Sequence, residues 1–233
     1  MFTLQNPKNK QNTLRRISNV LNNLTTIYEN GVYNCLSQCD NNNYYTGIID
    51  MNLLRQSEFY IQGGKGNTDL KEFPKGCYIK WNNVMNKRTS NERMILNTSN
   101  QGVSEQFALY MKKDYYHLFE SIKFLAKESS SNDNNPVKCD KIVIYYENRN
   151  RDNILNAISN YVNKNKIGLS SELSAFYDIY YDSSINAYVG IAEEKDRNTS
   201  FTRLNSICVI DAIKAGNKTP KEVFDYWLEK HKV

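Results

Sequence analysis

The segment Lys141–Tyr146 (KIVIYY) constrains the fold more than any other part of the chain. After its first residue it is a continuous run of β-branched and aromatic side chains, which is typical of a strand near the centre of a sheet. Side chains alternate along a strand, so Lys141, Val143 and Tyr145 are expected on one face. We therefore predict a sheet built around this segment, with Lys141 and Tyr145 facing a common cleft.

Other strand patterns occur on both sides of this segment in the sequence. Residues 76–81 (GCYIKW) and 93–98 (RMILNT) combine β-branched or aromatic side chains with turn residues at their ends, and 105–111 (EQFALYM) is a further candidate. Residues 175–181 and 187–192 predict a hairpin around the turn at 182–186 (DSSIN).

Helical periodicity marks several remaining segments, and it places their apolar side chains on one face. The first expected helix covers residues 12–29 and ends at Asn30-Gly31. A short helix is expected within residues 45–60, with Ile48, Leu53 and Leu54 facing inward. Further helices are expected at 115–127, 152–164, 200–215 and 220–231. This order predicts an α+β fold with a mixed or antiparallel central sheet flanked by helices. Residues 1–92 supply a helical region and the first strands, residues 93–233 supply the α+β core, and we expect both to form one compact domain.

The composition excludes several classes of function and partner. The net charge of +5 falls short of the dense basic stripe of a nucleic-acid binder, so no nucleic-acid partner is expected. The chain lacks a run of 18 apolar residues and an apolar signal-peptide core, so we expect no membrane partner and a cytoplasmic protein. Five Cys without a CxxC pair, and only two His, predict free thiols and no metal site, although the Cys35–Cys39 spacing fits helix neighbours and metal ligands equally.

Neither a nucleotide nor another cofactor is expected. The glycine-rich stretch Gln62–Gly66 (QGGKG) lacks the spacing of both common phosphate-binding loops, and we interpret it as a turn.

The start of the helix at residues 200–215 is a candidate anion site. Thr199 or Ser200 is a good N-cap, and Arg203 falls in the first turn, where the helix dipole disfavours a cation. A bound anion would explain a cation beside unpaired amides. The alternative is an arginine on a solvated helix face.

Further cations lie within or at the ends of strands. Lys138 and Lys141 flank Asp140 before the central strand. Lys80 lies inside a predicted strand between Ile79 and Trp81, where a partly buried amine can serve as a base. An edge-strand lysine that limits aggregation is the alternative for Lys80.

Five short pieces, taken in chain order, resemble the HopA-type family of type III effectors. They are Arg93-Met-Ile-Leu-Asn97, a helix with His117 near its start, Lys138-Cys-Asp-Lys-Ile-Val-Ile-Tyr145, Gly190-Ile-Ala-Glu-Glu194 and Ser200-Phe-Thr-Arg203. The family pattern is RxYxN, then (R/K)xDxxVxY, GxxxAxEP and SFGxxR. The resemblance covers about residues 93–215, half of the chain.

The resemblance implies a lyase that eliminates phosphate from phosphoserine or phosphothreonine. Some family members are effectors injected into a host cell. Others belong to gene clusters for ribosomal peptides of the lanthipeptide type, where a separate Ser/Thr kinase phosphorylates the peptide and the HopA-like partner leaves a dehydroamino acid. These lyases are related to phosphothreonine lyases, which use a Lys as the Cα base, a nearby acid for the leaving group and Arg or Lys to hold the phosphate. Eliminating phosphate in this way requires neither a metal nor a nucleotide. Together with the residue patterns above, this predicts Lys80 and Tyr145 as catalytic residues, and Arg93, Lys138, Lys141, Ser200 and Arg203 as phosphate ligands.

Several residues depart from the family pattern. Met94 replaces an aromatic residue, Lys195 a Pro and Thr202 a Gly, so that Arg203 comes one place early. Lys80 lacks the His two residues later that the phosphothreonine lyases carry, which leaves the general acid open. The alternative function is a non-catalytic effector or peptide-binding protein that docks on a protein partner.

Overall fold

The computed structural model describes residues 1–23, 26–39, 45–63, 66–68, 77–84, 89–126, 137–196 and 199–231. Its centre is a nine-stranded sheet in the order β1-β8-β9-β5-β7-β6-β4-β2-β3, and the pairings between these strands are antiparallel. The strands are β1 (Thr3–Asn6), β2 (Tyr60–Gly63), β3 (Gly66–Thr68), β4 (Tyr78–Asn82), β5 (Glu92–Leu96), β6 (Phe119–Leu125), β7 (Ile142–Tyr146), β8 (Asp178–Asp182) and β9 (Ala187–Glu193). The α+β fold class is therefore confirmed, with an antiparallel sheet.

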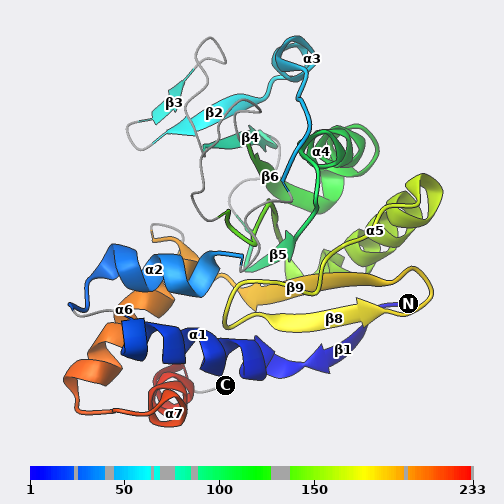
Figure 1. Ribbon diagram of the computed structural model, residues 1–233. Coiled ribbons are helices and arrows are strands. Elements are labelled where there is room, and N and C mark those ends of the chain that lie inside the picture. Colours follow the sequence, from blue (N-terminus) through cyan, green and yellow to red (C-terminus); the bar gives the residue numbers. More distant parts are fainter. Residues whose placement is uncertain are drawn as a thin grey trace.

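Helices cover both faces of the sheet (Figure 1). They are α1 (Lys10–Asn23), α2 (Glu29–Ser37), α3 (Met51–Gln56), α4 (Gln101–Tyr115), α5 (Arg151–Asn165), α6 (Phe201–Lys214) and α7 (Pro220–His231), with short 3-10 helices at Pro7–Asn9, Tyr116–Leu118 and Asn148–Asn150. Helices α4 and α5 pack on one face, and α1, α2, α6 and α7 form a group on the other (Figure 1). Within the described residues, each helix is too short or too polar to cross a membrane.

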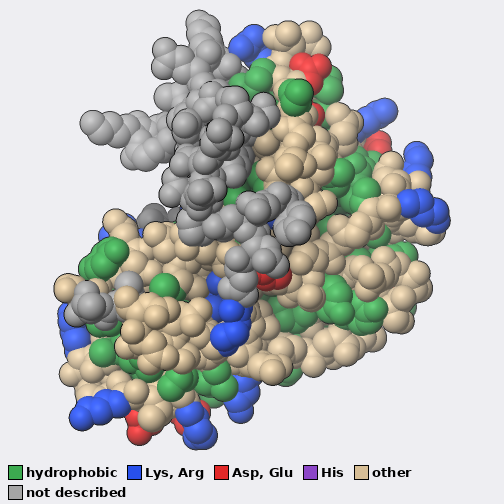
Figure 2. Space-filling model, in the orientation of Figure 1, with side chains coloured by type: hydrophobic (Ala, Val, Ile, Leu, Met, Phe, Trp, Pro, Cys, Tyr) green, Lys and Arg blue, Asp and Glu red, His purple; other side chains and the backbone are tan. Residues whose placement is uncertain are grey.

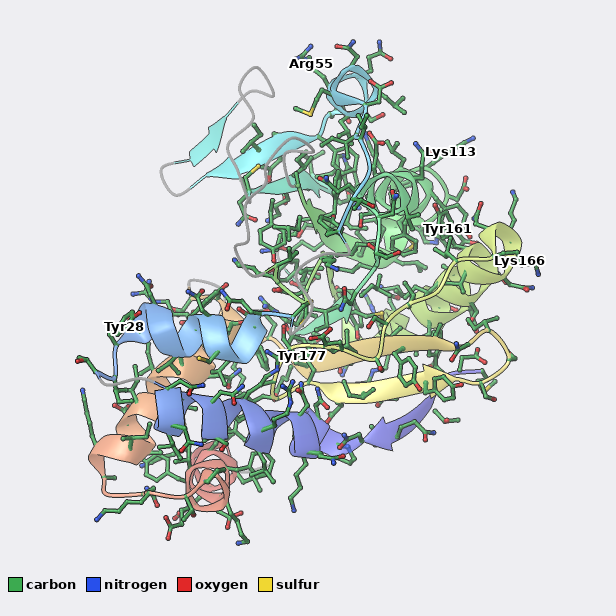
Figure 3. The ribbon with its side chains drawn as sticks, in the orientation of Figure 1. Tyr28, Arg55, Lys113, Tyr161, Lys166 and Tyr177 are labelled. Carbon is green, nitrogen blue, oxygen red and sulfur yellow. The ribbon has the colours of Figure 1, made fainter. Side chains whose placement is uncertain are left out.

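Strand β7 has the position that its sequence predicts. It lies fifth among the nine strands, paired with β5 on one side and β6 on the other. Ile142, Ile144 and Tyr146 belong to the main apolar core beneath α4 and α5, whereas Val143 belongs to a smaller cluster on the opposite face. Tyr177 lies in that smaller cluster, between the sheet and the α1–α2 layer (Figure 3).

Two of the predicted elements were wrong. Residues 105–111 were expected to form a strand but lie in α4, and residues 115–127 were expected to form a helix but contain β6. In β6 the side chains alternate, with Ile122 and Phe124 in the core and Ser121 and Lys123 on the opposite face. Apolar residues at 115, 118, 119 and 122 mimic a helical stripe because they span the end of one element and the start of the next.

The first predicted helix was also wrong in extent. α1 ends at Asn23, the backbone at Tyr28 is extended, and Asn30-Gly31 lies inside α2 rather than ending a helix. A Cβ on Gly31 would come within 2.9 Å of the Tyr28 ring, so glycine permits this ring to lie against α2 (Figure 3). Leu54 of the short helix α3 is buried as expected, but Leu53 of the same helix and Ile48, which precedes it, are exposed. Residues 127–136, which include the last residue of the helix expected at 115–127, lie outside the described residues.

Candidate functional site

A polar cavity of about 340 Å³ lies between one face of the sheet and the segment that leads into α6. Strands β2, β4, β5, β6 and β7 supply one wall, and the residues before α6 supply the other. The lining residues are Gln62, Lys80, Ser90, Arg93, Glu120, Ser121, Lys123, Tyr145, Glu194, Thr199 and Ser200. Lys80, Arg93, Tyr145 and Ser200, all of them predicted from the sequence, therefore share one cavity.

Strand register sets the positions of the two lysines. Lys80 in β4 pairs directly with Lys123 in β6, while the neighbouring Ile79 and Trp81 turn into the core. Two like charges directly opposite each other on adjacent strands repel. This repulsion is relieved when an anion binds between them or when one amine loses its proton. The pair therefore forms the part of the cavity best suited to a negatively charged group.

Tyr145 lies beside both lysines. Its ring centroid is 5.5 Å from Lys123 Nζ and 5.7 Å from Lys80 Nζ, and its hydroxyl accepts a hydrogen bond from Arg93 Nη2 at 3.1 Å. Burial alone would raise the pKa of Tyr145, but the charges of Lys123 and Arg93 outweigh it and hold that pKa below the ordinary value. Tyr145 is thus a better proton donor than a free tyrosine.

Arg93 is the buried cation of the site, with 4% of its surface exposed. It donates to Glu194 and to the hydroxyls of Tyr145 and Tyr177, and its guanidinium lies over the ring of Phe201 at 5.5 Å. Burial would lower the pKa of Arg93, but Tyr145, Tyr177 and Glu194 raise it well above its ordinary value. Arg93 therefore stays charged, and its ion pair with Glu194 fixes its orientation.

The remaining acid of the cavity is also tied to a neighbour. Glu120 Oε2 accepts hydrogen bonds from the backbone N–H and the hydroxyl of Ser90, at 3.1 and 2.7 Å. On the opposite wall, the Ser200 hydroxyl caps α6 by accepting a hydrogen bond from Arg203 N at 3.3 Å. The start of helix α6 thus lies at the cavity.

Three predicted phosphate ligands lie elsewhere: among the described residues, the lining of the cavity does not include Lys138, Lys141 or Arg203. The Arg203 side chain points away and pairs with Glu29 of α2 at 2.6 Å. On the face drawn in Figure 2, Lys and Arg side chains form separate small groups rather than one patch.

Lys138 and Lys141 have structural contacts instead. Lys138 Nζ lies 3.3 Å from the hydroxyl of Tyr33 and 5.3 Å from the Tyr78 ring. Lys141, 5% exposed, donates to the carbonyl of Thr98 at 2.8 Å and lies over the Tyr45 ring. Lys141 precedes the first residue of β7, so the alternation of that strand does not bring it beside Tyr145.

Sequence reasoning missed Lys123, because its segment was expected to be helical. The signal was present in FESIKFL, where serine and lysine alternate with isoleucine and phenylalanine at the period of a strand.

Comparisons with protein-family models, with curated proteins and with solved structures found no match. The cavity is cationic, contains a tyrosine and lies at the start of a helix.

Proposed function

We propose that the protein is a phosphoserine/phosphothreonine lyase, which eliminates phosphate from a peptide or protein that a separate kinase has phosphorylated. The observation that supports this most is the convergence of Lys80, Lys123, Arg93 and Tyr145 on one cavity. A phosphate monoester carries about two negative charges at neutral pH, and preorganised cations in a partly buried site stabilise such a group.

In this proposal the phosphate lies against Lys123 and Arg93, near the capped start of α6, with Lys80 beside it as a neutral amine. Lys123 and Arg93, which both line the cavity, are the cations that face the phosphate. The neutral amine on Lys80 relieves the repulsion within the Lys80–Lys123 pair. The site thus holds the leaving group before the reaction begins and stabilises it as it departs.

The elimination itself needs one base and one acid. Lys80, as a neutral amine, takes the proton from Cα of the phosphorylated residue. The electrons of that C–H bond form the Cα=Cβ double bond, and the Cβ–O bond breaks. Tyr145 donates its hydroxyl proton to the departing phosphate oxygen, an acid role that fits its lowered pKa. The products are hydrogen phosphate and a dehydroamino acid.

A mixture of short phosphoserine and phosphothreonine peptides tests this reaction. Mass spectrometry should find products lighter by one water than the unphosphorylated peptides. Lys80→Met should abolish the product, and Lys221→Met, which changes an exposed lysine of α7, should leave it unchanged. Peptides that bind at the cavity and return unaltered would contradict the lyase and favour the alternative, a non-catalytic peptide-binding protein.

A further inference from the structure

Two buried cysteines and a glutamate meet at the end of the sheet away from the cavity. The Cys39 and Cys139 sulfurs and a Glu172 carboxylate oxygen lie within 4.8 Å of one another. Cys39 is 6% and Cys139 0% exposed. Each residue comes from a different connection: Cys39 follows α2, Cys139 precedes β7, and Glu172 lies between α5 and β8. Distant parts of the chain thus place three potential metal ligands together.

Backbone hydrogen bonds fix the relative positions of the two cysteines. Gln38 and Lys138 form an isolated antiparallel bridge, in which Cys39 N donates to Val137 O at 2.7 Å and Cys139 N donates to Ser37 O at 2.8 Å. The segment that carries Glu172 is also fixed in place, because Asn97 Nδ2 donates a hydrogen bond to the carbonyl of Glu172 at 2.5 Å. A preorganised set of ligands lowers the entropic cost of binding a metal ion.

We infer that Cys39, Cys139 and Glu172 bind a zinc ion. In tetrahedral zinc sites the Zn–S and Zn–O distances of about 2.3 and 2.0–2.2 Å place neighbouring ligand atoms roughly 3.5–3.8 Å apart. Since the three atoms lie within 4.8 Å of one another, they need to approach by at most about 1.3 Å. Two thiolates and a carboxylate are a donor set suited to this ion. Binding releases the two thiol protons, because thiolates are the ligands.

The surroundings balance the charge of such a site. Two thiolates and a carboxylate bring three negative charges, which zinc and the buried guanidinium of Arg16 offset. Arg16 Nη2 lies 3.3 Å from Cys139 Sγ, and Asn97 Nδ2 lies 3.6 Å from Cys39 Sγ. Both donate to the sulfurs and would orient them as outer-shell groups do in metal sites.

Asn97 also provides for a fourth ligand. Its Oδ1 is buried and, among the described residues, has no hydrogen-bond partner. A zinc-bound water that donates to this oxygen would complete the coordination and satisfy the amide. The expectation of no metal rested on the lack of a CxxC pair and on the presence of only two His, whereas Cys39 and Cys139 are 100 positions apart and Cys139 and Glu172 are 33 apart.

Cobalt titration of the reduced, full-length protein tests the inference. Co²⁺ should produce a thiolate-to-metal charge-transfer band that saturates at one equivalent and disappears when zinc is added. Cys39→Ser and Cys139→Ser should each weaken Co²⁺ binding at least tenfold. Cys208→Ser, which changes a half-buried thiol of α6 outside this cluster, should bind as the unaltered protein does.

A second measurement guards against variants that fail to fold. Saturating zinc should raise the Tm of the unaltered protein and of Cys208→Ser. Folded, reduced, unaltered protein that gives neither a thiolate band nor a shift in Tm would overturn the inference. A Cys39–Cys139 disulfide that persists in a reducing buffer would overturn it equally. The inference does not depend on the proposed lyase activity.

Discussion

Tyr145 and Tyr146 are neighbours on β7 whose side chains lie on opposite faces of the sheet. The pKa of Tyr145 is held below its ordinary value, because Lys123 and Arg93 outweigh the effect of burial. The pKa of Tyr146 is raised, mainly by burial and also by Glu92. Among the described tyrosines whose pKa departs from its ordinary value, Tyr145 is the only one whose pKa is lowered.

An absorbance titration of tyrosinate should therefore show one tyrosine that ionises below about pH 10, the ordinary tyrosine pKa. Tyr145→Phe should remove this early phase, and Tyr146→Phe should keep it. Since the folded pKa is lower than the unfolded one, ionised Tyr145 contributes stability above about pH 10, and that contribution is lost as the pH falls through the folded pKa. An early phase that survives Tyr145→Phe would refute this assignment.

Gly190 permits the close packing that places Tyr177 under Arg93. A Cβ at this position would lie 2.7 Å from Ile95 Cγ1 and 3.2 Å from Tyr177 Cβ. Gly190→Ala should lower the free energy of unfolding by about 1–3 kcal/mol, as overpacking does. Gly168→Ala is the matched control, because nothing lies within 4 Å of its added Cβ. Equal Tm values for the two variants in thermal unfolding would contradict this packing.

Single residues show how far sequence reasoning reaches. Lys80 was identified because strand alternation alone separates it from Ile79 and Trp81. Arg203 was misplaced because its sequence position fixes the turn of α6 but not the direction of its side chain, and Glu29 of another helix decides that direction. The cap at Ser200 depends on local backbone geometry and was predictable.

At the scale of elements, β6 shows where sequence patterns fail. Its apolar residues fit a helix and a strand, and pairing with β4 and β7 selects the strand. Helix α4 was missed for a related reason, since the expected strand at 105–111 left out its N-cap, Asn100. That side chain accepts hydrogen bonds from Gly102 N and Val103 N, at 2.8 and 3.3 Å.

Removing this cap should destabilise the protein measurably. Asn100→Ala should lower the free energy of unfolding by about 1 kcal/mol, whereas Asn100→Asp, which keeps an acceptor at the cap, should lose much less. Urea denaturation followed by circular dichroism measures both. Similar losses for both variants would show that the capping hydrogen bonds contribute little.

For the whole molecule, the hairpin, the central strand and the last two helices followed from local patterns. The cavity did not, because β4, β5, β6 and β7 and the start of α6 come from segments far apart in the chain. The sheet order that joins them depends on which strands pair, and the pattern of one segment does not carry that information. The cluster of Cys39, Cys139 and Glu172 could not be predicted from the sequence either, because its residues also come from segments far apart in the chain.

The central claim is that the cavity at Lys80, Lys123 and Tyr145 binds a phosphate group. Calorimetric titration with phosphothreonine tests it directly, in the unaltered protein and in Lys123→Met and Arg203→Ala. We predict that Lys123→Met weakens binding at least tenfold, while Arg203→Ala, which removes an exposed ion pair, binds as the unaltered protein does. Undiminished binding in Lys123→Met, or loss of binding in Arg203→Ala alone, would contradict the account.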